Sequence, residues 1–352
     1  MPKNSLLTFT PNGIYCEQAD VYIDPWRRVD RALITHAHSD HARWGMGAYM
    51  AHHRSVPVMK LRLGKDIRVR GVGYGEKYLI NGVEISFHPA GHILGSSQIR
   101  LAWKDQVWVV SGDYKVENDG LATAFEPIEC THFITESTFG LPVYRWNPQE
   151  EVFKDINQWW ADNAAAGRAS LITAYSLGKA QRILEGVDHE IGPVFTHAAV
   201  ENTNDVFRQA GISLKSSTRV VANGPEAQKR NDFKGSLIIA PPAAAGSAWA
   251  KKLGPHSLGM ASGWMSIRGA RRRRAADRGF ILSDHADWDG LNTAIKATGA
   301  EHIYVTHGYT DIFSRWLREQ GYKAYIVETL FGQEEEETEE NPKEDQIQPK
   351  TD

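Results

Sequence analysis

The sequence predicts an α/β protein in which a smaller parallel α/β domain is inserted into a larger α/β domain. Six apolar, strand-like segments each lead to a histidine, an aspartate or a glutamate. Between about residues 140 and 278 the sequence pattern changes. There a strand, a glycine turn and a helix follow one another, which is the repeating unit of a parallel α/β sheet. The 352 residues, 41% hydrophobic and 24% charged, are enough for two soluble domains.

The first strand-like segment, residues 31–34, precedes the densest cluster of potential metal ligands. The next seven residues, 35–41, read Thr-His-Ala-His-Ser-Asp-His. If the strand continues, alternation of side chains places three of them on one face, while His41 swings round as the chain turns: His36, His38 and Asp40. Imidazole and carboxylate suit a catalytic zinc site, which keeps one position open for water.

Five more segments end in the same way. They are residues 83–87 before His92, 107–110 before Asp113, 133–135 before Glu136, 280–283 before Asp284 and His285, and 303–306 before His307. This repeated placement indicates sheets whose strand ends converge on one edge. Glycines at positions 91, 95, 112 and 308 would let the backbone pass close to the site.

The middle of the chain predicts the inserted domain. Asn147-Pro148-Gln149-Glu150 is typical of a helix start, with Asn147 as N-cap and Pro148 as the first helical residue, and the helix would run to Gly167. A buried strand follows at residues 170–174, and Ser176 to Lys179 open another helix. Further short strands are expected at residues 193–196 and 236–239.

Charge is unevenly distributed along the chain. The net charge is -3, but residues 333–352 carry nine acidic residues and two lysines, so the preceding body carries about +4. The tail is too acidic and too poor in apolar residues to fold, and it is either a solubilising extension or a competitor for a polyanion.

Two groups of residues are candidates for contacts with phosphate. The strongest basic run consists of Arg271, Arg272, Arg273 and Arg274, with Arg268 nearby. These side chains would either bind backbone phosphates or form a solvated face. Ser176 and Lys179, at a predicted helix start, either hold another phosphate or only pack in the core.

Composition also excludes several classes of protein. Cys16 and Cys130 are too few and too far apart for a cysteine-rich zinc module or a disulfide framework. No window is long and apolar enough to cross a bilayer, and the first 13 residues lack the features of a signal peptide. We therefore expect a cytoplasmic protein with no membrane partner.

The motifs together resemble those of a known family. In order along the chain, residues 36–41, Gly91-His92, Ser111-Gly112-Asp113 and Thr306-His307-Gly308 are similar to the metal-binding motifs of the metallo-β-lactamase superfamily. Glu136, His285 and the segment from Gly167 to Gln181 resemble the added motifs of its nucleic-acid-processing β-CASP branch. The resemblance spans about residues 7–332. It implies an αββα sandwich over residues 1–139 and 279–332 and a β-CASP domain at 140–278. The acidic segment at 333–352, which the composition predicts to be disordered, lies beyond the resemblance.

The resemblance implies a centre of two divalent metal ions, zinc or manganese. One ion would be held by His36, His38 and His92 and the other by Asp40, His41 and His307, with Asp113 as the bridge. Such a pair activates water and polarises a phosphodiester. Asp40, as a ligand of this pair, would also be a catalytic residue. His285, oriented by Glu136, would protonate the leaving oxygen. Asp24 would orient a ligand imidazole through its other ring nitrogen, and Asp284 would do likewise for a neighbouring group.

Within the branch, the short insertion and the sequence segments at residues 22–26 and 263–265 look most like those of bacterial ligase-associated DNA exonucleases. The resemblance thus implies DNA repair together with a DNA ligase and a helicase. Histidine at position 307 is instead usual in RNA-acting members, so an exo- or endoribonuclease stays open. A small-molecule thioester or lactam hydrolase needs neither the inserted domain nor the Glu136/His285 pair.

Overall fold

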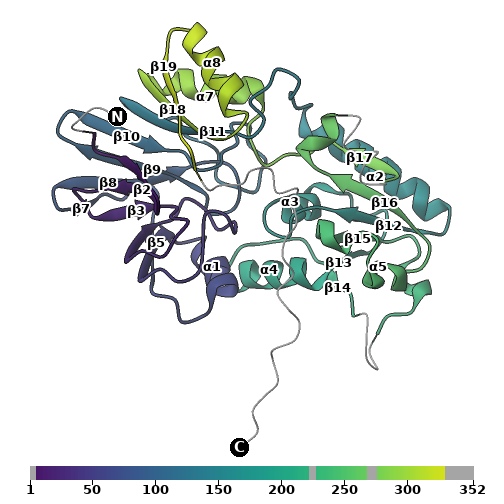
Figure 1. The fold of residues 1–352 in the computed structure, drawn as a ribbon. Helices are drawn as coiled ribbons and strands as arrows, with labels where there is room; N and C mark the ends of the chain where they lie inside the picture. The colour runs from purple at the N-terminus through teal and green to yellow at the C-terminus, as the bar shows by residue number, and fades with distance from the viewer. Residues whose placement is uncertain (1–4, 222–226, 268–275, 330–352) are drawn as a thin grey trace, which may run out of the picture.

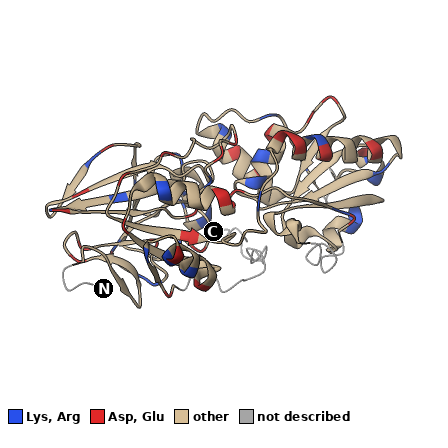
Figure 2. Ribbon diagram, turned by 90° about the horizontal axis from the view of Figure 1, so that it is seen from above, with Lys and Arg blue, Asp and Glu red and all other residues tan. Residues whose placement is uncertain are grey.

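The computed structural model describes residues 5–221, 227–267 and 276–329. The described residues form an α/β protein with three sheets, as predicted. Two of the sheets are stacked between helices, and the third sheet forms a separate lobe beside them (Figure 1). Seen from above, the lobes lie side by side, and charged residues of both signs occur along both (Figure 2). No helix in the described ranges is long and apolar enough to cross a membrane.

The first sheet comes from the N-terminal part of the chain and is covered on its outer face by α1 (Val56–Leu63). Its first three strands are antiparallel and the remaining pairs are parallel. In spatial order, which is also chain order, the strands are β1 (Thr8–Thr10), β2 (Gly13–Cys16), β3 (Val21–Ile23), β4 (Arg31–Leu33), β5 (Ala48–His52) and β6 (Val69–Val72).

The second sheet joins segments from both ends of the chain, and α7 (Trp288–Thr298) and α8 (Thr310–Glu319) cover its outer face. Its strands, in spatial order, are β19 (Lys323–Ile326), β18 (His302–Gly308), β11 (His132–Ser137), β10 (Gln106–Val110), β9 (Ser97–Trp103), β8 (Val83–Pro89) and β7 (Tyr78–Ile80). Side chains from both sheets, among them Ile23, Phe87 and Trp108, form one core between them. Consecutive side chains of a strand point to opposite faces, so the apolar run of β10 sends Trp108 and Val110 into this core and Val109 against the helices.

The third sheet belongs to the inserted segment and is parallel throughout. Its strands, in spatial order, are β14 (Thr218–Arg219), β13 (Val194–Thr196), β15 (Leu237–Ala240), β12 (Ala169–Thr173), β16 (His256–Ala261) and β17 (Arg278–Phe280). The helices of this lobe are α2 (Gln149–Ala165), α3 (Lys179–Gly186), α4 (Ala198–Gln209) and α5 (Ala248–Lys252), with short 3₁₀ helices at Arg230–Phe233, Pro242–Ala244 and Gly263–Ser266. The domain boundaries proposed after residues 139 and 278 stay predictions.

Three local expectations are wrong. Strand β4 ends at Leu33, and the ligand-rich run is a loop, because the amide of Thr35 donates to the Asp24 carboxylate instead of a strand partner (2.8 Å). Residues 281–283 are not a strand, and the Ser283 carbonyl accepts a hydrogen bond from Arg182 (2.6 Å). Helix α2 takes Pro148 as its N-cap, so Pro148 lies one position before the first helical residue, because its ψ of 135° is not helical.

Candidate metal centre

The ligand-bearing ends of several segments meet at one point of the sandwich. The loop after β4 supplies four of the candidate side chains, and the loops after β8 and β10 and the end of β18 supply His92, Asp113 and His307. Ligand atoms from these residues form overlapping groups within 4.8 Å of one another. The seven side chains predicted as ligands are therefore brought together, although they are spread over 272 positions: His36, His38, Asp40, His41, His92, Asp113 and His307.

Asp113 lies between two sets of histidines. Its Oδ2 atom faces His36 Nε2 at 3.5 Å and His92 Nε2 at 3.8 Å. Its Oδ1 atom faces His41 Nε2 at 3.6 Å and His307 Nε2 at 3.0 Å. Each carboxylate oxygen thus faces a different set of histidines, as a ligand that bridges two metal ions must.

All five histidines have their other ring nitrogen held by a neighbouring group. His41 Nδ1 donates to the buried Asp24 carboxylate at 2.8 Å, and His92 Nδ1 donates to the Asp284 carbonyl at 2.8 Å. The remaining partners are Thr35 Oγ1 for His36 (3.1 Å), the Leu177 carbonyl for His38 (3.1 Å) and Thr306 Oγ1 for His307 (2.9 Å). Partners of this kind fix the ring orientation of histidines that bind metal.

The donor set fits a divalent cation. His36 Nε2 is fully buried, and no group in the described part of the chain offers it a hydrogen bond. A buried polar atom without a partner is costly, and a metal ion would satisfy it. Imidazole nitrogens with carboxylate oxygens are ligands that suit zinc or manganese.

Electrostatics point the same way. Burial lowers the pKa of His36 and His38 below the ordinary value, and lowers that of His92 to about 3, so these rings are neutral at neutral pH and able to bind metal. Burial also acts to lower the pKa of His41, but the carboxylates of Asp40, Asp113 and Asp24 together outweigh it and raise this pKa to about 10. The ring of His41 therefore lies where the surrounding carboxylates strongly favour a cation.

Glu136 and His285 form a pair beside this centre. Glu136 Oε2 accepts a hydrogen bond from His285 Nδ1 at 2.8 Å, and Oε1 accepts one from the Tyr114 amide at 2.8 Å. Glu136 is buried, whereas the His285 side chain keeps 20% of its surface exposed and can reach a ligand. Burial opposes protonation of His285, but Glu136 and Asp113 together raise its pKa to about 9. Asp113, Glu136 and His285 also lie within 4.8 Å as a further group of potential ligands.

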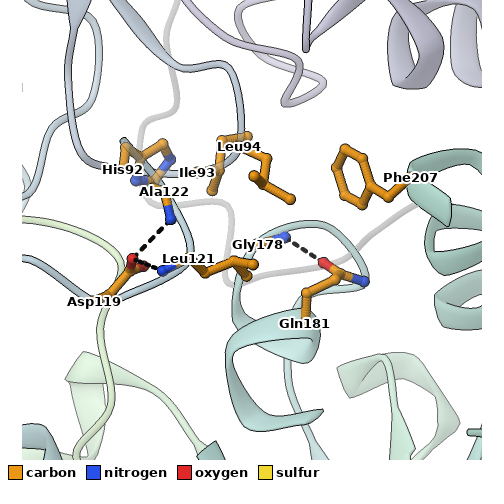
Figure 3. A pocket seen from close by; sticks show the side chains of 9 residues that line it. All are labelled: His92, Ile93, Leu94, Asp119, Leu121, Ala122, Gly178, Gln181 and Phe207. Atoms are coloured by element: carbon orange, nitrogen blue, oxygen red, sulfur yellow. Dashed lines mark hydrogen bonds between the residues drawn. The ribbon is translucent and has the colours of Figure 1, made fainter. Parts of the chain in front are cut away.

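The inserted lobe reaches the centre through the loop between β12 and α3. Besides the Leu177 carbonyl on His38, this loop places Gly178, with φ of 93°, against Ile93, where a Cβ atom would lie 2.4 Å from the Ile93 side chain. Gln181 holds the loop from behind: its Oε1 accepts from the Gly178 amide (2.8 Å) and its Nε2 donates to the Ser176 carbonyl (2.9 Å). Figure 3 shows Gly178 and Gln181 facing the segment that carries His92.

We expect Gln181→Met to weaken metal binding about 10- to 100-fold, because the loop that orients His38 loses its brace. Titration of the metal-free protein with Mn²⁺ or Zn²⁺ against a competing chelator measures the change. Asn163→Leu is the matched control, since Asn163 is an equally buried amide on the far side of the same lobe, bonded to Ser170 (2.9 Å). Equal metal affinity of the Gln181 variant and the wild type would contradict this role.

Two of the residues predicted to contact nucleic acid are buried. Lys179 Nζ lies 3.9 Å from the Asp284 carboxylate and 4.6 Å from the ring centre of Tyr175. Ser176 is also buried. The backbone carbonyl of Asp284 accepts the hydrogen bond from His92, while its carboxylate faces Lys179 and, at 3.4 Å, Arg182. Contacts of Ser176 and Lys179 with a polymer stay a prediction.

The predicted basic run does not belong to the part of the chain whose placement the structure gives. Its contacts with phosphate therefore stay a prediction too. The residues of this run that lie outside the described ranges are Arg268, Arg271, Arg272, Arg273 and Arg274.

Sequence reasoning assigned no role to several residues around the centre: Thr35, Leu177, Gln181 and Arg182. Leu177 acts through its backbone carbonyl, which every residue possesses, so no residue type signals it. Thr35 directly precedes the histidine run, and its hydroxyl could have been recognised in the sequence as a possible partner for a histidine ring. The contacts of Gln181 and Arg182 depend on how the lobes pack.

No known family model matches the chain. It is 28% identical to a probable DNA ligase of Opitutus terrae over 90% of its own length, but over only 30% of that protein. It is 22% identical to an RNase J-like protein of Methanocaldococcus jannaschii, covering 51% of this chain and 50% of that one. A ribonuclease of Thermus thermophilus shares 27% identity over 46% of this chain and 43% of its own. The chain thus spans half the length or less of these curated relatives.

Among solved structures, a protein of unknown function from Enterococcus faecalis shares the fold. Its TM-score is 0.58 with 12% sequence identity, covering 86% of this chain and 80% of that protein. At this level of identity the likeness concerns the fold alone and carries no statement about activity.

Proposed function

We propose that this chain, which belongs to the β-CASP branch of the metallo-β-lactamase superfamily, is a two-metal nuclease that hydrolyses phosphodiesters of DNA. The observation that carries the proposal is the position of Asp113 between the two histidine sets, with the Glu136–His285 pair beside it. Two bound divalent ions would supply an activated water and charge stabilisation for an in-line displacement.

The protein's own residues would perform the remaining steps. The seven ligand side chains set the positions of the two metal sites, and Asp24, Thr35 and the Asp284 and Leu177 carbonyls orient the imidazoles. Glu136 keeps His285 protonated and aimed, so His285 would donate a proton to the departing sugar oxygen. A proton donor at this position favours a phosphodiester, whose alkoxide is a poor leaving group, over a thioester.

DNA is proposed as the polymer because the relative matched over most of this chain is named a probable DNA ligase. A nuclease that trims ends before a ligase joins them is a consistent role, and we propose association with a DNA ligase and DNA repair on that ground. RNA is the second candidate, favoured by relatives named as ribonucleases and by the histidine at position 307.

A digest of matched polymers tests the proposal. Single-stranded DNA, duplex DNA and RNA of one sequence, each labelled at one end, are incubated with the protein and with Mn²⁺ or Zn²⁺. We expect products that shorten from one end of DNA, and at least about tenfold slower cleavage of RNA. Preferential cleavage of RNA would transfer the assignment to a ribonuclease, and no cleavage of any polymer, with metal bound, would refute the nuclease function.

A further inference from the structure

We infer that Trp44 and Arg28 form a stacking platform that holds an unpaired nucleotide of the substrate next to the candidate metal centre. This inference rests on the proposed nuclease function and deepens it, because it names single-stranded nucleic acid as the form that is bound. None of the motifs described above includes either residue.

Trp44 is the one tryptophan among the large, exposed hydrophobic residues of the described ranges, with 63% of its surface accessible. Isolated exposed apolar residues are common and need no explanation. Trp44 differs from the others in the cation beside it and in its position.

Arg28 covers part of the Trp44 ring. Its Cζ atom lies 4.6 Å from the ring centre, within the range of a cation–π contact. Gly45, with φ of 100°, makes room for this arrangement, since a Cβ atom there would lie 2.7 Å from Arg28 Nε. Over half of the surface of Trp44 stays accessible, so a nucleotide base can stack on its ring while Arg28 lies near the adjoining phosphate.

The loop that carries Trp44 is held in place. The hydroxyl of Tyr49 donates to the Arg43 carbonyl (2.8 Å) and accepts from the Met46 amide (3.1 Å), and the Gly47 amide donates to the Val29 carbonyl (2.9 Å). These bonds enclose Trp44 on both sides in the sequence. A platform ordered before binding loses little conformational entropy when a ligand stacks on it.

Trp44 follows the ligand His41 by three residues, so their Cα atoms are within about 11 Å. The Asp40 side chain, one residue before His41, is 45% exposed, and the centre is therefore open to solvent on the side of this loop. Residues 27–44 carry four arginines against two aspartates, a positive balance that suits phosphates. One strand can thus reach both the platform and the metal centre.

The occupant we infer is an unpaired strand, not a duplex. In a duplex both faces of each base are covered by neighbouring bases, whereas an unpaired base offers a face for stacking on an aromatic side chain. Stacking does not depend on base identity, so the platform would accept any sequence.

Steady-state cleavage by the metal-loaded protein tests this, with a single-stranded oligonucleotide and the same strand in a blunt duplex. Loss of one stacked base typically costs from about fivefold to a hundredfold in affinity. We expect Trp44→Ala to raise KM for the single strand about tenfold, with kcat and the duplex value nearly unchanged, and Trp44→Phe to restore most of the affinity. Arg28→Ala should have a smaller effect that weakens as salt is added.

Trp103→Ala is the matched control. Trp103 also has a cation over its ring, Lys104 Nζ at 3.8 Å, but it lies at the end of β9 where the hairpin turns into β10, opposite the end of β10 that leads to Asp113. This variant should bind the single strand like the wild type. An unchanged KM for Trp44→Ala, or an equal rise for single strand and duplex, would overturn the inference. A wild type that cleaves no polymer would instead refute the proposed function, and the platform with it.

Discussion

Replacing Asp113 by alanine is expected to lower kcat/KM at least about a thousandfold, equivalent to ~4 kcal/mol of transition-state stabilisation. The reason is geometric: Asp113 is the one side chain of the described site whose two oxygens face both histidine sets, at 3.5 and 3.8 Å on one side and 3.0 and 3.6 Å on the other. Without it, neither set of ligands is coupled to the other, and metal content measured by elemental analysis should fall together with turnover.

The fold should survive this change, since Asp113 lies in a loop after β10 and its main contacts are with ligand histidines. Thermal unfolding of the metal-free variant and of the metal-free wild type should therefore be similar. Asp277→Asn provides the control, because Asp277 accepts hydrogen bonds from the Ser257 hydroxyl (3.2 Å) and the Leu258 amide (2.8 Å) in the inserted lobe. If Asp113→Ala kept wild-type turnover and metal content, the two-metal proposal would have to be abandoned.

Replacing His285 by alanine is expected to lower kcat about 10²- to 10⁴-fold while both metal ions stay bound. The potential ligand atoms that lie within 4.8 Å of one another group His285 with Asp113 and Glu136, and with no other histidine. His285 is held by Glu136 at 2.8 Å, so its loss removes a proton donor and leaves the seven ligands in place. Separate measurements of turnover and metal content distinguish this result from that of Asp113→Ala.

The pH dependence gives the pair a second signature. A proton donor works in its protonated form, so the rate should fall as pH rises through the pKa of His285. Glu136 is the neighbour that most strongly raises this pKa. Glu136→Gln removes that charge, which lowers the pKa and should move the alkaline limb of the kcat profile to lower pH. If the alkaline limb stayed at the wild-type pH, its titration would belong to a group other than His285.

Several features of the molecule follow from short-range sequence patterns. The alternation of residues 83–87 and the apolar runs at residues 107–110 and 303–306 predicted β8, β10 and β18 to within two residues, because both patterns are local properties of the sequence. The change of pattern after residue 140 predicted the parallel sheet of the inserted lobe. The continued strand at residues 34–41 was a wrong prediction, since a distant carboxylate, Asp24, captures the Thr35 amide.

The residue types of the candidate centre were therefore determined by the sequence alone: imidazoles and carboxylates occur at strand ends, and a resemblance orders them into two sets. Only the tertiary structure decided how they are held and what lies beside them. The Leu177 carbonyl contacts His38 across 139 positions, and the Asp284 carbonyl contacts His92 across 192. Backbone carbonyls are the same in every residue, and burial of Lys179 or stacking of Arg28 on Trp44 depends on chain packing, so local sequence carries no signal for them.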